Sequence, residues 1–233
     1  MLQHLKELYG SKLNATDGDI GKIEDFYFDD QSWNVRYLVA ETGTWLNERQ
    51  VLISPYSIER LDLEDELIIV NLTRKEIENS PPIERHRPVS RQSEIEYYTY
   101  YGWPYYWSGD AILGLGGNPM AHTDGNVVRV VNEEGNLNDD THLYSTLAIT
   151  EYEIEASDGT VGRVTDFLLD DKTWAIQKLV VEAGHWYSGK EILIPTNKIK
   201  RISYAESKIH VYLTKRDIEL TGEHHVAHAH RDR

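Results

Sequence analysis

One stretch of this chain occurs twice, and the duplication limits the fold more than any other feature of the sequence. The first copy begins Ala15-Thr-Asp-Gly-Asp-Ile-Gly-Lys-Ile-Glu-Asp-Phe, and the second begins Ala156-Ser-Asp-Gly-Thr-Val-Gly-Arg-Val-Thr-Asp-Phe. The offset is 141 residues (158 − 17 = 141 and 186 − 45 = 141), and it persists without a gap to Leu72 and Leu213. A long repeat of this kind predicts two copies of one small domain, each of about 70 to 80 residues.

The two copies share a set of turn, bend and loop residues. An Asp-Gly pair between apolar alternations is a strong turn signal, and a glycine inside a strand marks a bend or the close approach of another backbone. We interpret the recurring aspartate of each copy as a carboxylate that accepts backbone N–H bonds at a strand bend beside a bulge, not as a catalytic group. The shared signature is Asp17, Gly18, Gly21, Asp25, Gly43 and Trp45, repeated as Asp158, Gly159, Gly162, Asp166, Gly184 and Trp186.

Each copy contains six short apolar runs separated by turn residues. The run from Trp33 to Glu41, like its counterpart in the second copy, is apolar at consecutive positions, which predicts a central strand covered on both faces. Regular short strands predict a closed antiparallel barrel or a small sandwich. Thr73-Arg-Lys-Glu76 and Thr214-Lys-Arg-Asp217 are capping signatures, each predicting a helix of one or two turns at the end of its unit. Residues 1–10 carry leucines at helical spacing but provide too few turns for a stable helix.

Residues 83–143 break the repeat. We predict a connection of about 60 residues without regular structure, which is far longer than ordinary loops and therefore either functional or disordered. Tyrosine and tryptophan supply large rigid contact areas at protein interfaces, so this segment is a candidate partner-binding surface. The alternative is that the same aromatic side chains dock on their own barrels and hold the two halves together. The aromatic residues in question are Tyr97, Tyr98, Tyr100, Tyr101, Trp103, Tyr105, Tyr106 and Trp107.

Composition excludes several classes of function. The formal net charge is −15, with 39 acidic and 24 basic residues, and this disfavours nonspecific binding to nucleic acid or anionic lipid. The chain has no cysteine, so disulfides, thiolate catalysis and cysteine-bound metals are excluded. The N-terminus carries no signal-peptide hydrophobic region, and no apolar run approaches the roughly 20 residues that span a bilayer. We therefore expect a cytoplasmic protein without direct membrane insertion.

The repeated residues resemble the PRC-barrel family. The resemblance lies in the Asp17 to Phe26 motif, the Leu38-Val39 strand, Gly43, Leu52-Ile-Ser-Pro55 and Leu72-Thr73, all with counterparts in the second copy. The family is named for the cytoplasmic domain of the photosynthetic reaction centre H subunit, and it also supplies the C-terminal domain of a ribosome maturation factor. It implies a mainly β protein with two small antiparallel six-stranded barrels, each closed by a short helix. The expected divisions are a first barrel (1–82), an aromatic and glycine-rich linker (83–143), a second barrel (144–222) and a histidine-rich tail (223–233).

The same resemblance implies an assembly or regulatory module that binds other proteins, with the photosynthetic role attached only by the family label. The sequence contains no phosphate loop, dinucleotide fingerprint, zinc-protease motif or nucleophile elbow, so we predict no catalytic, cofactor-binding or metal-binding residues. His185 is a lone candidate base beside Trp186, and its counterpart is Thr44, which favours a surface or packing role. The paired aspartates at 29 and 30 lack the ligand spacing of a calcium loop.

The leading hypothesis is a protein-binding scaffold whose barrels pair about a pseudo-twofold axis, within one chain or between chains. One alternative is RNA or ribosome-maturation-related binding, in which the aromatic residues and Arg85, Arg87 and Arg91 would stack on bases. Another is a carrier of a pigment, quinone or metal ion between the barrels. The histidines of the tail allow weak metal capture, but a frayed polar tail is the favoured explanation.

Overall fold

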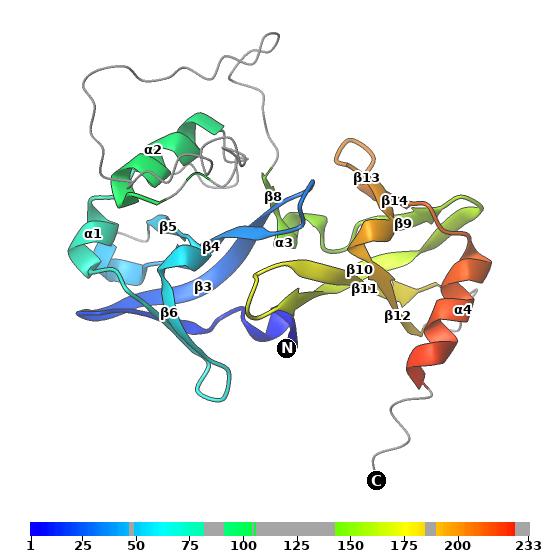
Figure 1. The fold of residues 1–233 in the computed structure, drawn as a ribbon, viewed down its shortest axis with the longest axis horizontal. Helices are drawn as coiled ribbons and strands as arrows, with labels where there is room; N and C mark the ends of the chain where they lie inside the picture. The colour runs from blue at the N-terminus through cyan, green and yellow to red at the C-terminus, as the bar shows by residue number, and fades with distance from the viewer. Residues whose placement is uncertain (47–48, 82–90, 104, 106–142, 185–189, 227–233) are drawn as a thin grey trace, which may run out of the picture.

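The computed structural model describes residues 1–46, 49–81, 91–103, 105, 143–184 and 190–226, and two seven-stranded sheets dominate it. The two halves of the chain lie side by side along the long axis, with the N-terminus between them (Figure 1). The first sheet runs β5 (Gln50–Ile53), β4 (Val35–Glu41), β3 (Gly18–Asp29), β2 (Lys12–Ala15), β7 (Leu67–Val70) and β6 (Ile58–Asp62). The second runs β12 (Glu191–Pro195), β11 (Ile176–Ala183), β10 (Gly159–Asp170), β9 (Glu153–Ala156), β14 (Lys208–Val211) and β13 (Ile199–Ser203).

Each half contributes six strands, as predicted, but the seventh strand of each sheet comes from the other copy. Strand β8 (Leu143–Ser145) pairs with β3, and β1 (Leu2–His4) pairs with β10. The sheets are antiparallel, as predicted, except at one position in each half, where β2 pairs with β7, and β14 with β9, in parallel. Within the described residues the sheet path does not close, since its end strands are not paired with each other.

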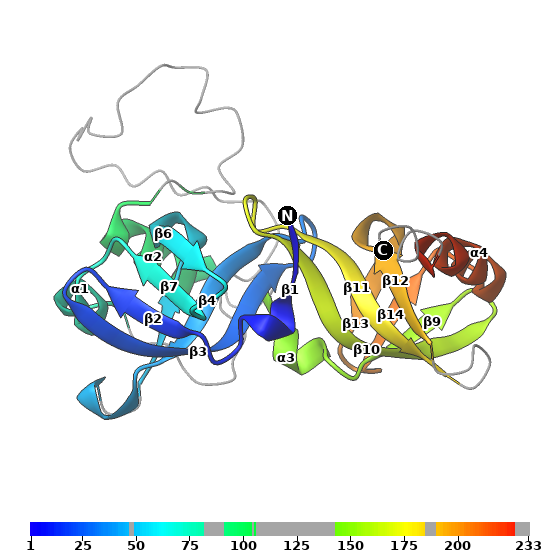
Figure 2. The same ribbon diagram turned by 90° about the horizontal axis from the view of Figure 1, so that it is seen from below.

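The exchange of strands follows the 141-residue repeat. Leu2 lies opposite Asp170 in the second sheet, and Leu143 lies opposite Asp29 in the first. An isolated bridge between Asn34 and Ala175 joins the two halves at equivalent positions of the repeat. Seen from below, β1 reaches across the boundary between the halves (Figure 2). The two halves are therefore related by an approximate twofold axis, and each completes the sheet of the other.

One hydrophobic core continues through both halves. Phe28 stacks on Trp33 with ring centroids 5.1 Å apart and lies 6.4 Å from Phe167 of the second half. The shared apolar cluster extends from Leu5 to Ile218. Because two units of this size bury little apolar area alone, a common core and exchanged strands stabilise both.

The two longest strands bend at the predicted positions. The pairing register shifts between Ile23 and Asp25 in β3, and at the equivalent place in β10, which confirms the predicted bulges. The predicted close backbone approach is also confirmed, since a Cβ on Gly21 would lie 1.9 Å from the carbonyl oxygen of Glu41. The equivalent atom on Gly162 would lie 2.0 Å from a backbone oxygen. Both positions therefore exclude every side chain.

Both predicted capping boxes are present. The Thr73 amide donates to the Glu76 carboxylate at 2.7 Å, and the Thr214 amide donates to Asp217 at 2.9 Å. The first box starts α1 (Arg74–Glu78), which has the expected length. The second starts α4 (Lys215–Val226), which is longer than predicted and runs through the Thr-Gly pair at 221–222. Its backbone therefore continues into the segment assigned to the tail.

Two segments expected to lack regular structure contain it. Residues 2–4 form β1 and a 3-10 turn follows at Leu5–Glu7, so the leucines of the lead-in belong to a strand and a turn. The linker contains α2 (Arg91–Tyr101), and β8 begins at its last residue, followed by α3 (Thr146–Ile149). The expectation of an entirely irregular connection is therefore wrong for these parts. Residues 106–142 lie outside the described residues.

Candidate protein-binding surface

The helix of the linker, α2, lies on the outer face of the first barrel. Side chains alternate along β4, so Leu38 faces the shared core while Tyr37 and Val39 face outward. An outward-facing apolar strand needs a cover, and α2 provides it. The cluster beneath the helix, called the α2 socket below, consists of Tyr27, Tyr37, Val39, Leu52 and Leu143, with Tyr97 and Tyr98 inserted from the helix.

Two of the predicted partner-binding tyrosines are buried in this socket. Tyr97 and Tyr98 each lie with their ring centroids 6.3 Å from that of Tyr37, in tilted and edge-on arrangements. Trp103 packs edge-on against Tyr98 at 5.6 Å and stacks on Tyr101 at 4.3 Å. Each aromatic pair of this kind contributes about 0.5–1.5 kcal/mol beyond burial alone. The buried side of the linker helix thus holds α2 on its own barrel.

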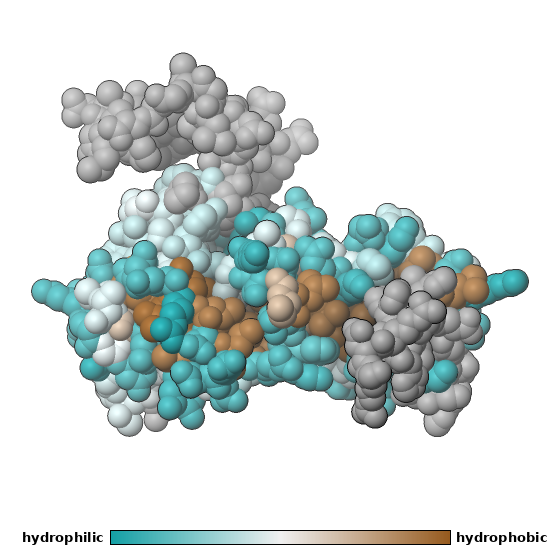
Figure 3. Space-filling model, turned by 60° about the horizontal axis from the view of Figure 1, so that its bottom comes forward, coloured by the Kyte–Doolittle hydropathy of each residue, from teal (hydrophilic) through white to brown (hydrophobic). Residues whose placement is uncertain are grey.

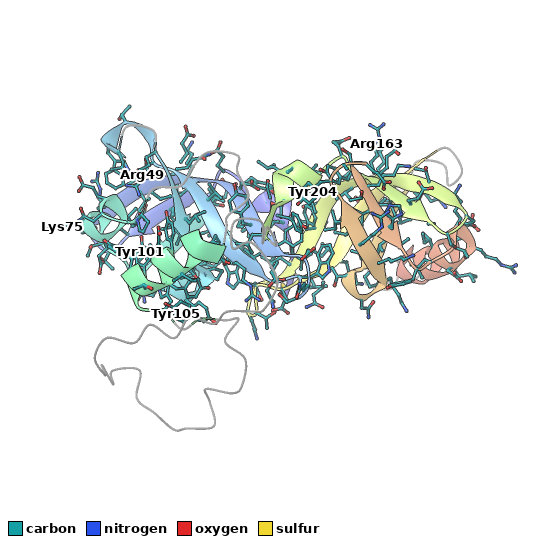
Figure 4. The ribbon with its side chains drawn as sticks, turned by 90° about the horizontal axis from the view of Figure 1, so that it is seen from above. Arg49, Lys75, Tyr101, Tyr105, Arg163 and Tyr204 are labelled. Atoms are coloured by element: carbon teal, nitrogen blue, oxygen red, sulfur yellow. The ribbon has the colours of Figure 1, made fainter. Side chains whose placement is uncertain are left out.

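Hydrogen bonds fix the helix against α1. The Tyr100 hydroxyl donates to the carbonyl of Glu76 at 2.8 Å, and the Tyr97 hydroxyl donates to the carbonyl of Pro81. Arg49 donates to the carbonyl oxygens of Glu78 at 3.0 Å and Pro81 at 2.9 Å. The segment that follows α1 is therefore held from both sides. Figure 4 shows Arg49 and Lys75 at this end of the first barrel, with Tyr101 on the nearby helix.

Burial changes the chemistry of these phenols. Desolvation raises the pKa of Tyr97, Tyr98 and Tyr101, and it raises the pKa of Tyr27 to about 12. The hydroxyl groups stay protonated at neutral pH, so they can donate hydrogen bonds. The Tyr37 hydroxyl, for example, donates to the buried Glu94 carboxylate at 3.3 Å. The contacts of the cluster are thus aromatic packing and hydrogen bonding.

The opposite side of the same segment is exposed. Tyr100 is 40% exposed and Tyr105 is 38% exposed. Tyr105 stacks on Tyr98 with centroids 5.9 Å apart, and its hydroxyl lies 2.8 Å from that of Thr99. These contacts hold an exposed aromatic ring in a defined place (Figure 4). The other predicted residues, Tyr106 and Trp107, lie outside the described residues.

Sequence reasoning did not identify the residues beneath the helix. It predicted that both faces of the Trp33 to Glu41 strand are covered, which the burial of this strand confirms. The cover itself, with Glu94 and the Leu143 strand, was not found. Apolar side chains at alternate outward positions, together with adjacent tyrosines in the linker, were the available signal.

The recurring aspartates connect the two halves. Asp25 accepts the amide of Leu147 at 3.2 Å and the Thr146 hydroxyl at 3.0 Å. Asp166 accepts the amide of Lys6 at 3.0 Å and lies 2.6 Å from the Nδ1 of His4. Backbone N–H donation to these carboxylates was predicted and is confirmed. Asp25 accepts the amide of its neighbour Phe26 at 2.7 Å, whereas the donors Leu147 and Lys6 belong to the other copy. Burial raises the pKa of Asp25, against the lowering effect of its hydrogen bonds.

The remaining signature residues have structural contacts. Asp17 and Asp158 accept the first helical amides, from Arg74 at 2.7 Å and Lys215 at 2.9 Å. The Trp45 indole donates to a carbonyl of β3 at 2.6 Å, under the guanidinium of Arg74. The glycines at 18, 43 and 159 have positive φ, and the glycine at 184 donates a backbone hydrogen bond to β10. His185 and Trp186 lie outside the described residues.

Two of the open clefts formed by the described residues lie on or beside the second half of the chain. The larger, of about 600 Å³, lies between the halves and is lined by Asp30 to Trp33 from the first half and by Thr196 to Ile202 from the second. Tyr204 stacks on Tyr144 with centroids 4.4 Å apart near this junction (Figure 4). The described part of the chain contains no group of three or more acidic or histidine side chains placed to hold a metal ion. It also contains no helix of the length and apolarity required to cross a membrane.

Two small β units with exchanged strands and one shared core define a duplicated β-barrel protein. The sequence profile of the PRC-barrel domain matches residues 4–77 and 153–218. The chain therefore belongs to the PRC-barrel family and carries two copies of its domain. No curated protein matches the sequence.

Proposed function

We propose that this protein is a non-catalytic assembly module that binds another protein in the cytoplasm. The observation that carries the proposal is the two-sided arrangement of α2 and the residues after it. Tyr97 and Tyr98 lock the helix onto the first barrel, while Tyr100 and Tyr105 remain substantially exposed. An aromatic side chain held on a rigid element loses little entropy on binding and is typical of interface hot spots.

Other features support an assembly role. The shared core and exchanged strands make both barrels one platform, so a partner bound to one half is placed relative to the other. Figure 3 shows a band of apolar residues that crosses both halves on the face viewed there. Extended apolar surface is characteristic of interaction sites. The carboxylates of the half-buried Asp25 and the buried Asp166 are engaged in hydrogen bonds that hold the halves together, which gives them a structural role.

The test is affinity co-purification from the native cells with a double variant, Tyr100→Ser and Tyr105→Ser. Both side chains are exposed, so the fold should be retained, as checked by circular dichroism and thermal unfolding. Deletion of the segment would not discriminate, because it also removes the two buried tyrosines. Tyr212→Ser, an exposed tyrosine on the second half, is the matched control. We expect partners retained by the wild type and the control to be lost by the double variant; identical recoveries from all three would refute the proposal.

A further inference from the structure

One edge of the second sheet lies beside the larger of the two clefts. Strand β13 is an end strand of that sheet, because within the described residues it pairs only with β14. The other wall of the cleft is the turn between β3 and β4, which ends close to β13 (Figure 1). An end strand carries main-chain N–H and C=O groups that face away from its sheet and can pair with a further strand. The cleft therefore borders a strand edge that the described part of the chain leaves open.

The side chains of β13 show that the cleft follows this edge. Ile199 and Ile202 lie opposite buried residues of β14 and pack against the shared core. Lys200 is the extra residue at a shift in the pairing register, so it and Arg201 both face solvent. All four of these consecutive residues border the cleft. Because they belong to both faces of the sheet, the cleft runs along the edge of the strand and not over one face.

The charge of this edge differs from that of its counterpart in the first half. The repeat offset of 141 residues places Glu59 where β13 has Lys200, while Arg60 and Arg201 are equivalent. Arg201 pairs with Glu206 at 3.3 Å. The Lys200 side chain is exposed and forms no hydrogen bond or ion pair with the described residues. Its ammonium group is therefore available to an acidic group of another molecule, at a position where the first half carries a carboxylate.

A second copy of the chain does not suit this edge. Two β13 strands paired about a twofold axis would place Lys200 and Arg201 close to the same cations of the other copy, and like charges directly opposite are destabilising. Lysine on an end strand is a common means of preventing such pairing. The net charge of −15 also opposes self-association. The charge of the edge thus favours an acidic segment of a different protein.

We infer that this edge, called the β13 edge below, accepts an extended segment of a partner protein in which acidic and apolar residues alternate. The side chains of a strand point to opposite faces in turn. Acidic residues on one face would lie beside Lys200, and apolar residues on the other face would lie beside Ile199 and Ile202. The inference rests on the proposed protein-binding function and gives it a second surface, separate from Tyr100 and Tyr105.

The probe is a synthetic peptide, acetyl-Glu-Val-Glu-Val-Glu-Val-Glu-amide, added to the full-length protein and followed by NMR. We expect saturable shifts of the amide signals of residues 199–202 and slower hydrogen exchange at this strand. Two further peptides are N-methylated, one at the glutamates and the other at the valines. One should lose binding and the other should keep it, because a strand pairs on one side through the amides of alternate residues.

A charge reversal tests the chemistry of the edge. Lys200→Glu gives β13 the charge that the first half has at Glu59, and it should weaken binding of the peptide about fivefold or more. A peptide with lysine in place of glutamate should prefer this variant to the wild type. The matched control is Lys75→Glu, which changes the net charge equally at the far end of the first half (Figure 4). It should change the affinity by less than about twofold, since distant exposed charges are screened by salt.

Several outcomes would overturn the inference. They are no saturable shifts at residues 199–202, equal binding of both N-methylated peptides, or equal weakening by Lys200→Glu and Lys75→Glu. Concentration-dependent shifts of the same amides without peptide would assign the edge to a second copy. Binding only after replacement of Glu133, Glu134, Asp139 and Asp140 by their amides would assign it to the chain's own acidic segment.

The result also separates this inference from the proposed function. Failure here with a positive co-purification result leaves the proposed function intact. Peptide binding with a negative co-purification result removes only the role of Tyr100 and Tyr105.

Discussion

In the first barrel α2 lies across the outer face of β4 and buries Tyr97 and Tyr98, whereas in the second barrel the equivalent strands border an open cleft. The inner surfaces of both barrels, by contrast, contribute equivalent residues to one core. The residues kept by the duplication are those that bend strands, cap helices and exchange contacts between halves. The outer faces have diverged. The difference indicates that the repeated signature encodes the framework, while the outer surfaces distinguish the two halves.

The largest effect expected from a single substitution is at the shared glycines. In Gly21→Ala or Gly162→Ala the new methyl would overlap a backbone oxygen, which cannot move aside as a side chain can. We expect each variant to lose about 4 kcal/mol or more of unfolding free energy, measured by chemical denaturation. Gly10→Ala is the control. Its φ of 80° is strained for alanine, but no atom lies within 4 Å of the added carbon. It should lose about 1 kcal/mol. Similar losses at all three positions would show that strain, not the clash, dominates.

The next largest loss of stability is expected at Tyr98, which the first barrel buries beneath α2. Tyr98→Ala removes one of the two tyrosines inserted in the α2 socket and should cost about 3 kcal/mol, the usual range for truncating a buried aromatic side chain. The exposed Tyr105→Ala should cost less than about 1 kcal/mol, because little buried surface is lost. Both values come from urea unfolding of the full chain. A negligible loss in Tyr98→Ala would mean that α2 contributes no stability to the first barrel, and the comparison with the open cleft would lose its basis.

A smaller effect tests whether the equivalent helix caps of the two halves contribute equally to the free energy of unfolding. Thr73→Ala and Thr214→Ala each remove the hydroxyl that accepts the amide of Glu76 at the start of α1 or of Asp217 at the start of α4. Each should cost about 1 kcal/mol of unfolding free energy. Calorimetry of the two variants beside the wild type measures this. A clearly larger loss in Thr214→Ala would show that the longer α4 has taken on a stabilising role absent from α1.

Features that depend on residues close together in the sequence were predicted correctly, whereas features that depend on distant residues were missed. Turns, bulges and caps depend on a few neighbouring residues, so Asp17-Gly18, the bend at Asp25 and the Thr73 box were predicted correctly. The exchange of β1 and β8 was missed, because short strands of three residues carry no periodic signal and their partners lie more than 100 positions away. Helix α2 was missed for a related reason. Its tyrosines face the socket on one side and solvent on the other, so no apolar stripe distinguishes the two sides.

The smallest expected effect is the pH dependence of the junction between the halves. Burial raises the pKa of Asp25 above its usual value of 3.8, so the folded protein holds this proton more tightly than the unfolded chain does. Its contribution to stability is therefore fully present below about pH 3.8 and is lost as the pH rises through the raised pKa. Asp25→Asn keeps the shape and cannot ionise. We expect the stability of the wild type relative to Asp25→Asn to fall as the pH rises from 3.8 toward neutrality. Urea unfolding of both proteins across that pH range measures the difference in stability. Because both proteins carry the same other carboxylates, the titration of those groups cancels in the difference. A relative stability that rises with pH would mean that the hydrogen bonds from Thr146 and Leu147 outweigh desolvation, and that this junction is held by a charged carboxylate.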